Sequence, residues 1–144
     1  MHAFLRYLRE RVVEKAGGLS DEEARASGVA SGTNLMWLVK HLAVAEMNWF
    51  TYMYSGSEVG KYGPHPLAEG DTLDSVLASY RDAAKLSDEI IAGCQDLDTL
   101  AARVWPGDPG RSMRWILVHM VEETARHAGH ADILREQIDG AAGR

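Results

Sequence analysis

The stretch that decides the fold lies at residues 113–139 and reads MRWILVHMVEETARHAGHADILREQID. At ~100° per residue, one stripe of a helix built from it collects apolar side chains at helical spacing. The stripe is roughly 120° wide and holds Ile116, Met120, Glu123, His127, His130, Ala131, Leu134 and Ile138. Ser112 precedes the segment as an expected N-cap, and Gly140 follows it as an expected stop. The pattern predicts a long amphipathic helix whose stripe faces a core.

Three further helical segments are predicted upstream, separated by loops that contain glycine and proline. They run from about His2 to Lys15, from near Thr33 to about Tyr54, and from near Thr72 to just before Gly93. Ser20 is expected to cap a short acidic turn after the first of them. Residues 55–70 contain four glycines and two prolines, which predicts a loop. Because no segment alternates with a period of two, the sequence predicts an all-α four-helix bundle of unspecified connectivity.

The composition limits what this bundle does. The chain has 144 residues with 46% hydrophobic and 25% charged side chains, which is typical of one globular domain spanning 1–144. Its formal charge of -6 argues against nucleic acid as a partner, since phosphate binding needs a concentrated basic surface. Without a signal peptide or an apolar stretch of spanning length, no membrane association is expected. Cys94 is the only cysteine, so a cytoplasmic location and a packing role for this thiol are expected.

A carboxylate on the core-facing stripe raises an energetic problem. Glu123 and His127 lie one helical turn apart and only about 40° apart around the axis, whereas Glu122 lies well off the stripe. Burying an unpaired carboxylate costs several kcal/mol. No Lys or Arg lies on the same stripe to offset that cost. A metal ion shared by Glu123 and His127 would offset it.

The predicted helix at 33–54 offers a third ligand. His41 falls on one side of it, among apolar neighbours such as Trp37 and Leu38. Two histidines and one glutamate make a recognised ligand set for catalytic zinc, with one position left for water or substrate. Ni²⁺, Mn²⁺ or Fe²⁺ could use the same groups. Spacing alone leaves the alternative open that these are ordinary hydrogen-bonded core residues.

Two segments resemble a known family. Residues 113–132 (MRWILVHMVEETARHAGHAD) resemble the last helix of DinB-like four-helix-bundle proteins, and residues 38–50 (LVKHLAVAEMNWF) resemble the second helix of that family. The similarity is strongest to the mycothiol-dependent maleylpyruvate isomerase-like subfamily. The wider family holds its metal with three histidines, two of them as His-x3-His, and this subfamily has Glu at the first of those two. The resemblance therefore implies metal ligands at His41, Glu123 and His127.

The resemblance also implies a function. It points to a metal-dependent S-transferase or isomerase that uses a low-molecular-weight thiol such as mycothiol and a small electrophilic substrate. Zn²⁺ is the first choice of metal. His130, about one turn beyond His127, is the candidate acid–base catalyst, with a ligand-orienting or structural hydrogen bond as its alternative roles.

Other functions stay open at this level. The same ion could activate water in a metal-dependent hydrolase, or it could only stabilise a non-catalytic stress-response or binding bundle. A homodimer is also expected as an option, because related bundles pair through their helices. Di-iron chemistry is disfavoured because it requires Glu-x2-His, and Glu123 is followed three residues later by Arg126.

Overall fold

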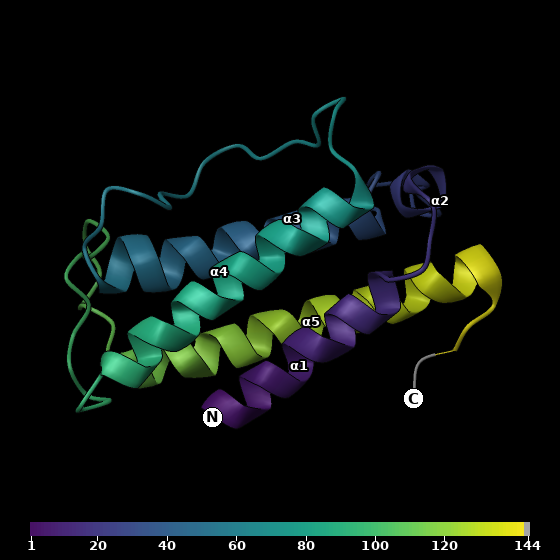
Figure 1. The fold of residues 1–144 in the computed structure, drawn as a ribbon. Helices are drawn as coiled ribbons and strands as arrows, with labels where there is room; N and C mark the ends of the chain where they lie inside the picture. Colours follow the sequence, from purple (N-terminus) through teal and green to yellow (C-terminus); the bar gives the residue numbers. More distant parts are fainter. Residues whose placement is uncertain (143–144) are drawn as a thin grey trace.

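The structure is a helical bundle, as predicted (Figure 1). The computed structural model describes residues 1–142. Its helices are α1 (His2–Ala16), α2 (Asp21–Arg25), α3 (Leu35–Glu46), the π-helix η1 (Met47–Tyr54), α4 (Leu73–Gly93) and α5 (Met113–Asp139). The only extended pairing within 1–142 is an isolated bridge between Leu100 and Ser112. The expected acidic turn after α1 is itself the short helix α2.

The connectivity that the sequence left open is visible in Figure 1. α1 and α5 run in the same direction and pack along each other, while α3 and α4 both run in the opposite direction and form the other close pair. The loop between η1 and α4 therefore has to travel back along the outside of the bundle before α4 begins. This crossover loop, residues 55–72, passes over α3 and contributes to the candidate site described below.

The helix ends form where the sequence predicts them because polar side chains satisfy the free backbone N–H groups. Ser112 Oγ accepts a hydrogen bond from the N–H of Trp115 at the start of α5, and Ser20 caps α2 with a complete capping box. Gly140 ends α5 in a left-handed conformation (φ 77°), which glycine adopts without steric cost. Both predicted caps and the predicted stop are confirmed.

The second predicted helix differs from expectation in its last two turns. It is α-helical only as far as Glu46 and then widens into η1, where the N–H of Ser55 donates across five residues to the carbonyl of Phe50 (3.0 Å). Such wide turns are rare and have no propensity signal, so a sequence pattern predicts a plain α-helix instead. In η1, Asn48 is 3% exposed and turned to accept a backbone hydrogen bond from the crossover loop.

A buried ion pair joins the two halves of the bundle. Arg9 of α1 donates to both carboxylate oxygens of Glu46 at the end of α3 (2.7 Å each) and to Asp88 of α4 (2.6 Å). Glu46 is fully buried and Arg9 is 5% exposed. Burial lowers the pKa of Arg9, but the two carboxylates raise it by more, so this side chain stays charged. Because Arg9 and Glu46 are buried and pair with each other, losing either one would leave the other charge unpaired, so this pair holds α1 and α3 in one arrangement, with Asp88 of α4 as a further partner of Arg9.

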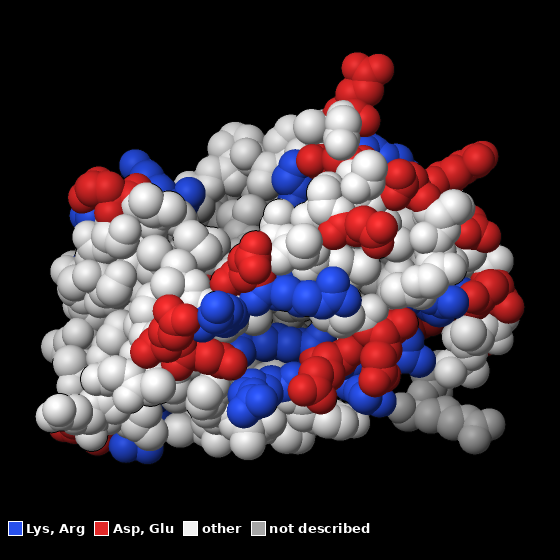
Figure 2. All heavy atoms as spheres, viewed as in Figure 1, with Lys and Arg blue, Asp and Glu red and all other residues white. Residues whose placement is uncertain are grey.

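The surface in Figure 2 carries charges of both signs. Over the groove between α1 and α4, Arg6, Arg81 and Lys85 alternate with Glu10 and Asp88. This face therefore lacks the uniform positive potential that a nucleic-acid surface has. No helix within residues 1–142 has the length and apolar character needed to cross a bilayer.

We expect Arg9→Leu to lower the free energy of unfolding by about 3–5 kcal/mol, because it leaves the Glu46 carboxylate buried and unpaired. Arg11→Ala is the matched control, since Arg11 is partly exposed and contacts only side chains of its own helix, Glu14 and the ring of Tyr7, among the residues that the structure describes, and it should change stability by about 0–1 kcal/mol. Urea unfolding followed by circular dichroism measures both variants. Equal stability of the two would show that the ion pair does not hold the bundle together.

Candidate metal centre

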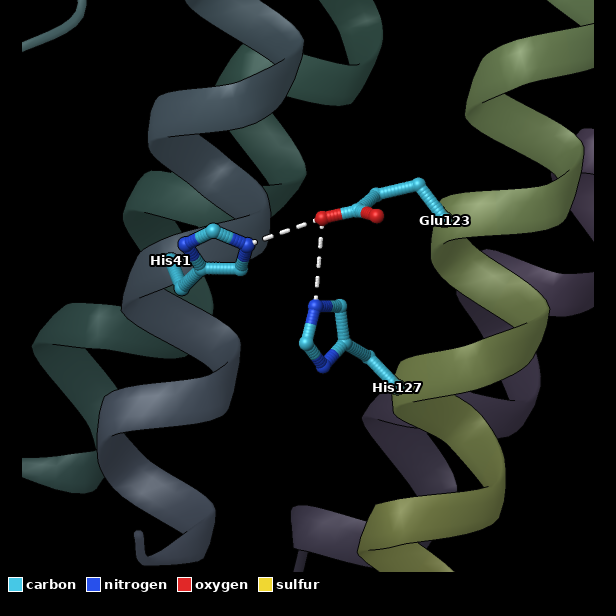
Figure 3. Close-up of side chains that lie close together, drawn as sticks. All are labelled: His41, Glu123 and His127. Carbon is cyan, nitrogen blue, oxygen red and sulfur yellow. Dashed lines mark hydrogen bonds and ion pairs between the residues drawn. The ribbon is translucent and has the colours of Figure 1, made fainter.

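The three side chains predicted to share an ion lie together in the structure. His41 comes from the middle of α3, and Glu123 and His127 come from successive turns of α5 (Figure 3). One donor atom of each lies within 4.8 Å of the others. The three side chains are only 12–14% exposed. Two helices that are far apart in the sequence thus present three potential ligands to one point.

Both imidazoles approach the same carboxylate oxygen. Nε2 of His41 lies 3.0 Å from Oε1 of Glu123, and Nε2 of His127 lies 3.1 Å from that same oxygen. Burial raises the pKa of Glu123, but contact with the two imidazoles lowers it by more, so the carboxylate stays ionised. Burial lowers the pKa of His127 below its ordinary value, which favours the neutral imidazole that metals bind.

The donor set fits a divalent metal. An unprotonated Nε2 on each ring would bring three electron-rich atoms together, and their lone pairs repel unless protons or a cation lie between them. Two imidazole nitrogens and one carboxylate oxygen match the ligand types of three-residue zinc sites. The same donors suit several first-row metals, so the geometry supports a divalent ion without choosing which one.

The sequence argument left Glu123 without an arginine or lysine partner on its own helix, and this expectation is wrong. Arg126 lies off the core-facing stripe, as predicted, but its guanidinium still reaches Oε2 of Glu123 at 3.2 Å and also pairs with Glu122. The sequence argument missed this partner because a long arginine side chain spans three residues along a helix surface. Arg126 is 52% exposed, so its pairing is a weak surface contact. The case for an ion therefore depends on Oε1, which faces the two imidazoles.

His130 lies beside the cluster but on its outer side. Its Nδ1 is 3.3 Å from Nδ1 of His127, and the residue is exposed, whereas the helical stripe predicted a core-facing side chain. The apolar stripe continues through Ala131 and Leu134, which are buried. His130 sits at the edge of that stripe, where a ring can contact a neighbour and still reach solvent.

The structure adds three side chains that the sequence did not single out for the site. His65, in the crossover loop, approaches His41, and the rings of both stack on the indole of Trp37. Tyr62 from the same loop lies edge-on to His65. The sequence signal that could have indicated His65 is its position between Pro64 and Pro66, which restrict the backbone on either side of it.

Two other residues lie outside the cluster. His119, one turn before Glu123, stacks on Trp115 (ring planes 10° apart), and burial lowers its pKa. The Cys94 thiol, just past the end of α4, contacts the hydroxyl of Tyr54 and the backbone of Asp96. This placement agrees with the packing role expected for the thiol.

Comparison with known proteins identifies the fold and the family of the chain. A conserved protein from Enterococcus faecalis has a similar crystal structure, with a TM-score of 0.73 and 14% sequence identity over 97% of this chain and 95% of that one. At that identity the likeness establishes the fold alone. The profile of the mycothiol-S-transferase family matches residues 1–140, so the chain belongs to this DinB-like family. No curated protein matches the chain at a significant level.

The variants His41→Ala, Glu123→Ala and His127→Ala test whether these three side chains share an ion. Each variant should lose bound metal, because two remaining ligands hold a divalent ion far more weakly than three. Elemental analysis of untagged protein, purified without chelator, measures the content.

His119→Ala is the matched control, because it removes an imidazole from the same helix outside the cluster. It should retain the wild-type metal content. Full metal content in all three ligand variants would rule out this cluster as the metal site.

Proposed function

We propose that the protein is a metal-dependent S-transferase that joins the thiol of mycothiol, or of a similar small thiol, to a small electrophile. In this proposal His41, Glu123 and His127 are the metal ligands. The observation that carries it is the convergence of two imidazoles on one carboxylate oxygen, at 3.0 and 3.1 Å, in a member of the mycothiol-S-transferase family. Zn²⁺ is the metal we expect first, because it favours this His2Glu set and leaves a position free for a substrate atom.

A divalent ion bound here would lower the pKa of a coordinated thiol, so that a nucleophilic thiolate exists at neutral pH. The protein's own part is to hold the two helices at the right separation and to keep the donor atoms partly shielded from water. Their 12–14% exposure suits that part, because electrostatic interactions strengthen as water is excluded. With an alkyl halide or an epoxide, the reaction forms one S–C bond and breaks the bond from that carbon to its leaving atom. With an unsaturated acid, the new S–C bond replaces the π bond, and the neighbouring carbon takes a proton from solvent.

The thiol proton needs an acceptor, and we assign that role to His130. This imidazole is exposed and in contact with His127, so it can exchange protons with solvent while staying next to the cluster. In the proposal it takes the proton from the thiol, and solvent or the leaving group receives it afterwards. General acid–base groups of this kind contribute roughly 10²–10⁴-fold to rate.

Thiol consumption by the zinc-loaded protein tests the function directly. We expect loss of free thiol with mycothiol and an electrophile panel of alkyl halides, epoxides and unsaturated acids. The rate should fall to background after the metal is removed by a chelator, and again in Glu123→Ala. Bacillithiol and glutathione serve as comparison thiols.

No turnover with any thiol would reject the transferase. Hydrolysis of simple esters without thiol would identify the same cluster as a hydrolase centre instead.

In the same assay, His130→Gln should lower kcat by roughly 10²-fold, because it removes the group that accepts the proton. Its metal content should equal that of wild type, since His130 is outside the three donors. Wild-type kcat in His130→Gln would remove this residue from the chemistry without affecting the metal site.

A further inference from the structure

The crossover loop brings an additional imidazole behind one of the proposed ligands. Nε2 of His65 lies 3.2 Å from Nδ1 of His41, which is the ring nitrogen that does not face Glu123. On the other side of its own ring, Nδ1 of His65 lies 2.8 Å from the carbonyl oxygen of Gly63. His41 is thus connected to a backbone carbonyl through a second histidine.

For neutral rings, the contacts of His65 favour one arrangement of protons. A carbonyl oxygen can only accept, so Nδ1 of His65 must carry the hydrogen and donate it to Gly63. Nε2 of His65 is then an acceptor, and Nδ1 of His41 must be the donor to it. In a neutral His41 ring this arrangement leaves Nε2 unprotonated on the side of Glu123 and His127, where a bound metal ion would satisfy its lone pair. That is the tautomer in which His41 can bind a metal at this point. Without a metal, Oε1 of Glu123, 3.0 Å away, competes for a hydrogen on Nε2.

Aromatic contacts hold the two rings in place. The indole of Trp37 stacks on His41 (ring centres 5.1 Å apart, planes 14° apart) and on His65 (5.7 Å, 18°). Tyr62 lies edge-on to His65 with its ring centre 5.3 Å away. Offset-stacked and edge-on arrangements are the favoured geometries of such rings. The plane of His41 is therefore set by packing as well as by its hydrogen bond.

The loop that carries His65 is fastened at both sides of this residue. Before it, the N–H of Tyr62 donates to the buried side chain of Asn48 in η1 (3.1 Å). After it, Nζ of Lys40 donates to the carbonyl of Pro66 (2.8 Å). Lys40 is the residue next to His41 on α3, so the same helix turn supports both the ligand and the loop.

The other proposed histidine ligand lacks such a constraint. Nδ1 of His127 contacts Nδ1 of His130, and within residues 1–142 no backbone carbonyl fixes which of these two nitrogens carries the hydrogen. His130 is also exposed, whereas His65 is half-buried. His65 and His130, which contact the two proposed histidine ligands, therefore differ in one respect. The hydrogen bond to the carbonyl of Gly63 fixes the tautomer of His65, and His130 has no such bond among residues 1–142.

We propose that His65 is a positioning residue, which fixes the tautomer and ring plane of His41 and so strengthens metal binding. The proposal rests on the metal site put forward above and extends it to a residue outside the three donors. Outer hydrogen-bond partners of metal-bound histidines typically contribute 10–100-fold to metal affinity.

Two substitutions at this position separate the hydrogen bond from the packing. His65→Phe keeps a ring that can stack on Trp37 but removes the acceptor, so the dissociation constant for Zn²⁺ should rise by roughly 10–100-fold. His65→Gln keeps an acceptor without the ring and should restore most of the affinity. Competition with a chromophoric chelator measures each dissociation constant, with Zn²⁺ as the probe.

His119→Phe is the matched control. It exchanges another imidazole that stacks on a tryptophan, but this one does not contact the cluster through a hydrogen bond. Its affinity for Zn²⁺ should equal that of wild type. Wild-type affinity in His65→Phe together with a loss of affinity in His65→Gln would show that only the ring matters and would overturn the proposal.

A second readout does not depend on bound metal. In metal-free Glu123→Ala protein, which lacks the carboxylate that competes for a hydrogen on Nε2, ¹⁵N imidazole shifts of the neutral His41 ring should show hydrogen on Nδ1. Adding His65→Gln to this background should keep that preference. His65→Phe should lose this preference. Hydrogen on Nε2 of His41 in the metal-free Glu123→Ala protein would overturn the proposal, and so would wild-type zinc affinity in His65→Phe. Failure of wild type to bind zinc would overturn the metal site as well, which distinguishes the two proposals.

Discussion

The structure depends on one constraint, which is that two imidazole nitrogens and a carboxylate oxygen meet at a single point between α3 and α5. Oε1 of Glu123 lies 3.0 Å from His41 and 3.1 Å from His127, with all three side chains mostly shielded from water. Electron-rich atoms stay this close only when protons or a cation lie between them. The proposed metal, the thiol chemistry and the role of His65 all depend on a cation at that point.

The path of the chain through the bundle positions the residues around this point of contact. Since α3 and α4 run in the same direction, residues 55–72 have to return along the outside of the bundle. That return places His65 behind His41 and fastens the loop to Asn48 and Lys40. The Arg9–Glu46 pair fixes the end of α3 against α1. A simple up-and-down bundle with short loops would provide the three donors but not the histidine behind them.

Much of this was accessible from the sequence, and the remainder was not for physical reasons. Helical periodicity and caps such as Ser112 are local signals, and the inward pair Glu123–His127 follows from spacing on one helix. His41 required a second helix, and the family resemblance supplied the pairing. The π-turn at Met47, the reach of Arg126 and the position of His65 depend on contacts between segments distant in space, which no local pattern encodes.

The most direct test is X-ray absorption at the zinc edge of the reconstituted protein. The account predicts a first shell with two imidazole nitrogens and a carboxylate oxygen at about 2.0–2.2 Å and no sulfur. Addition of mycothiol should then introduce one sulfur at about 2.3 Å. A sulfur ligand before any thiol is added, or a shell of water and carboxylate without imidazole, would contradict the assignment of His41, Glu123 and His127.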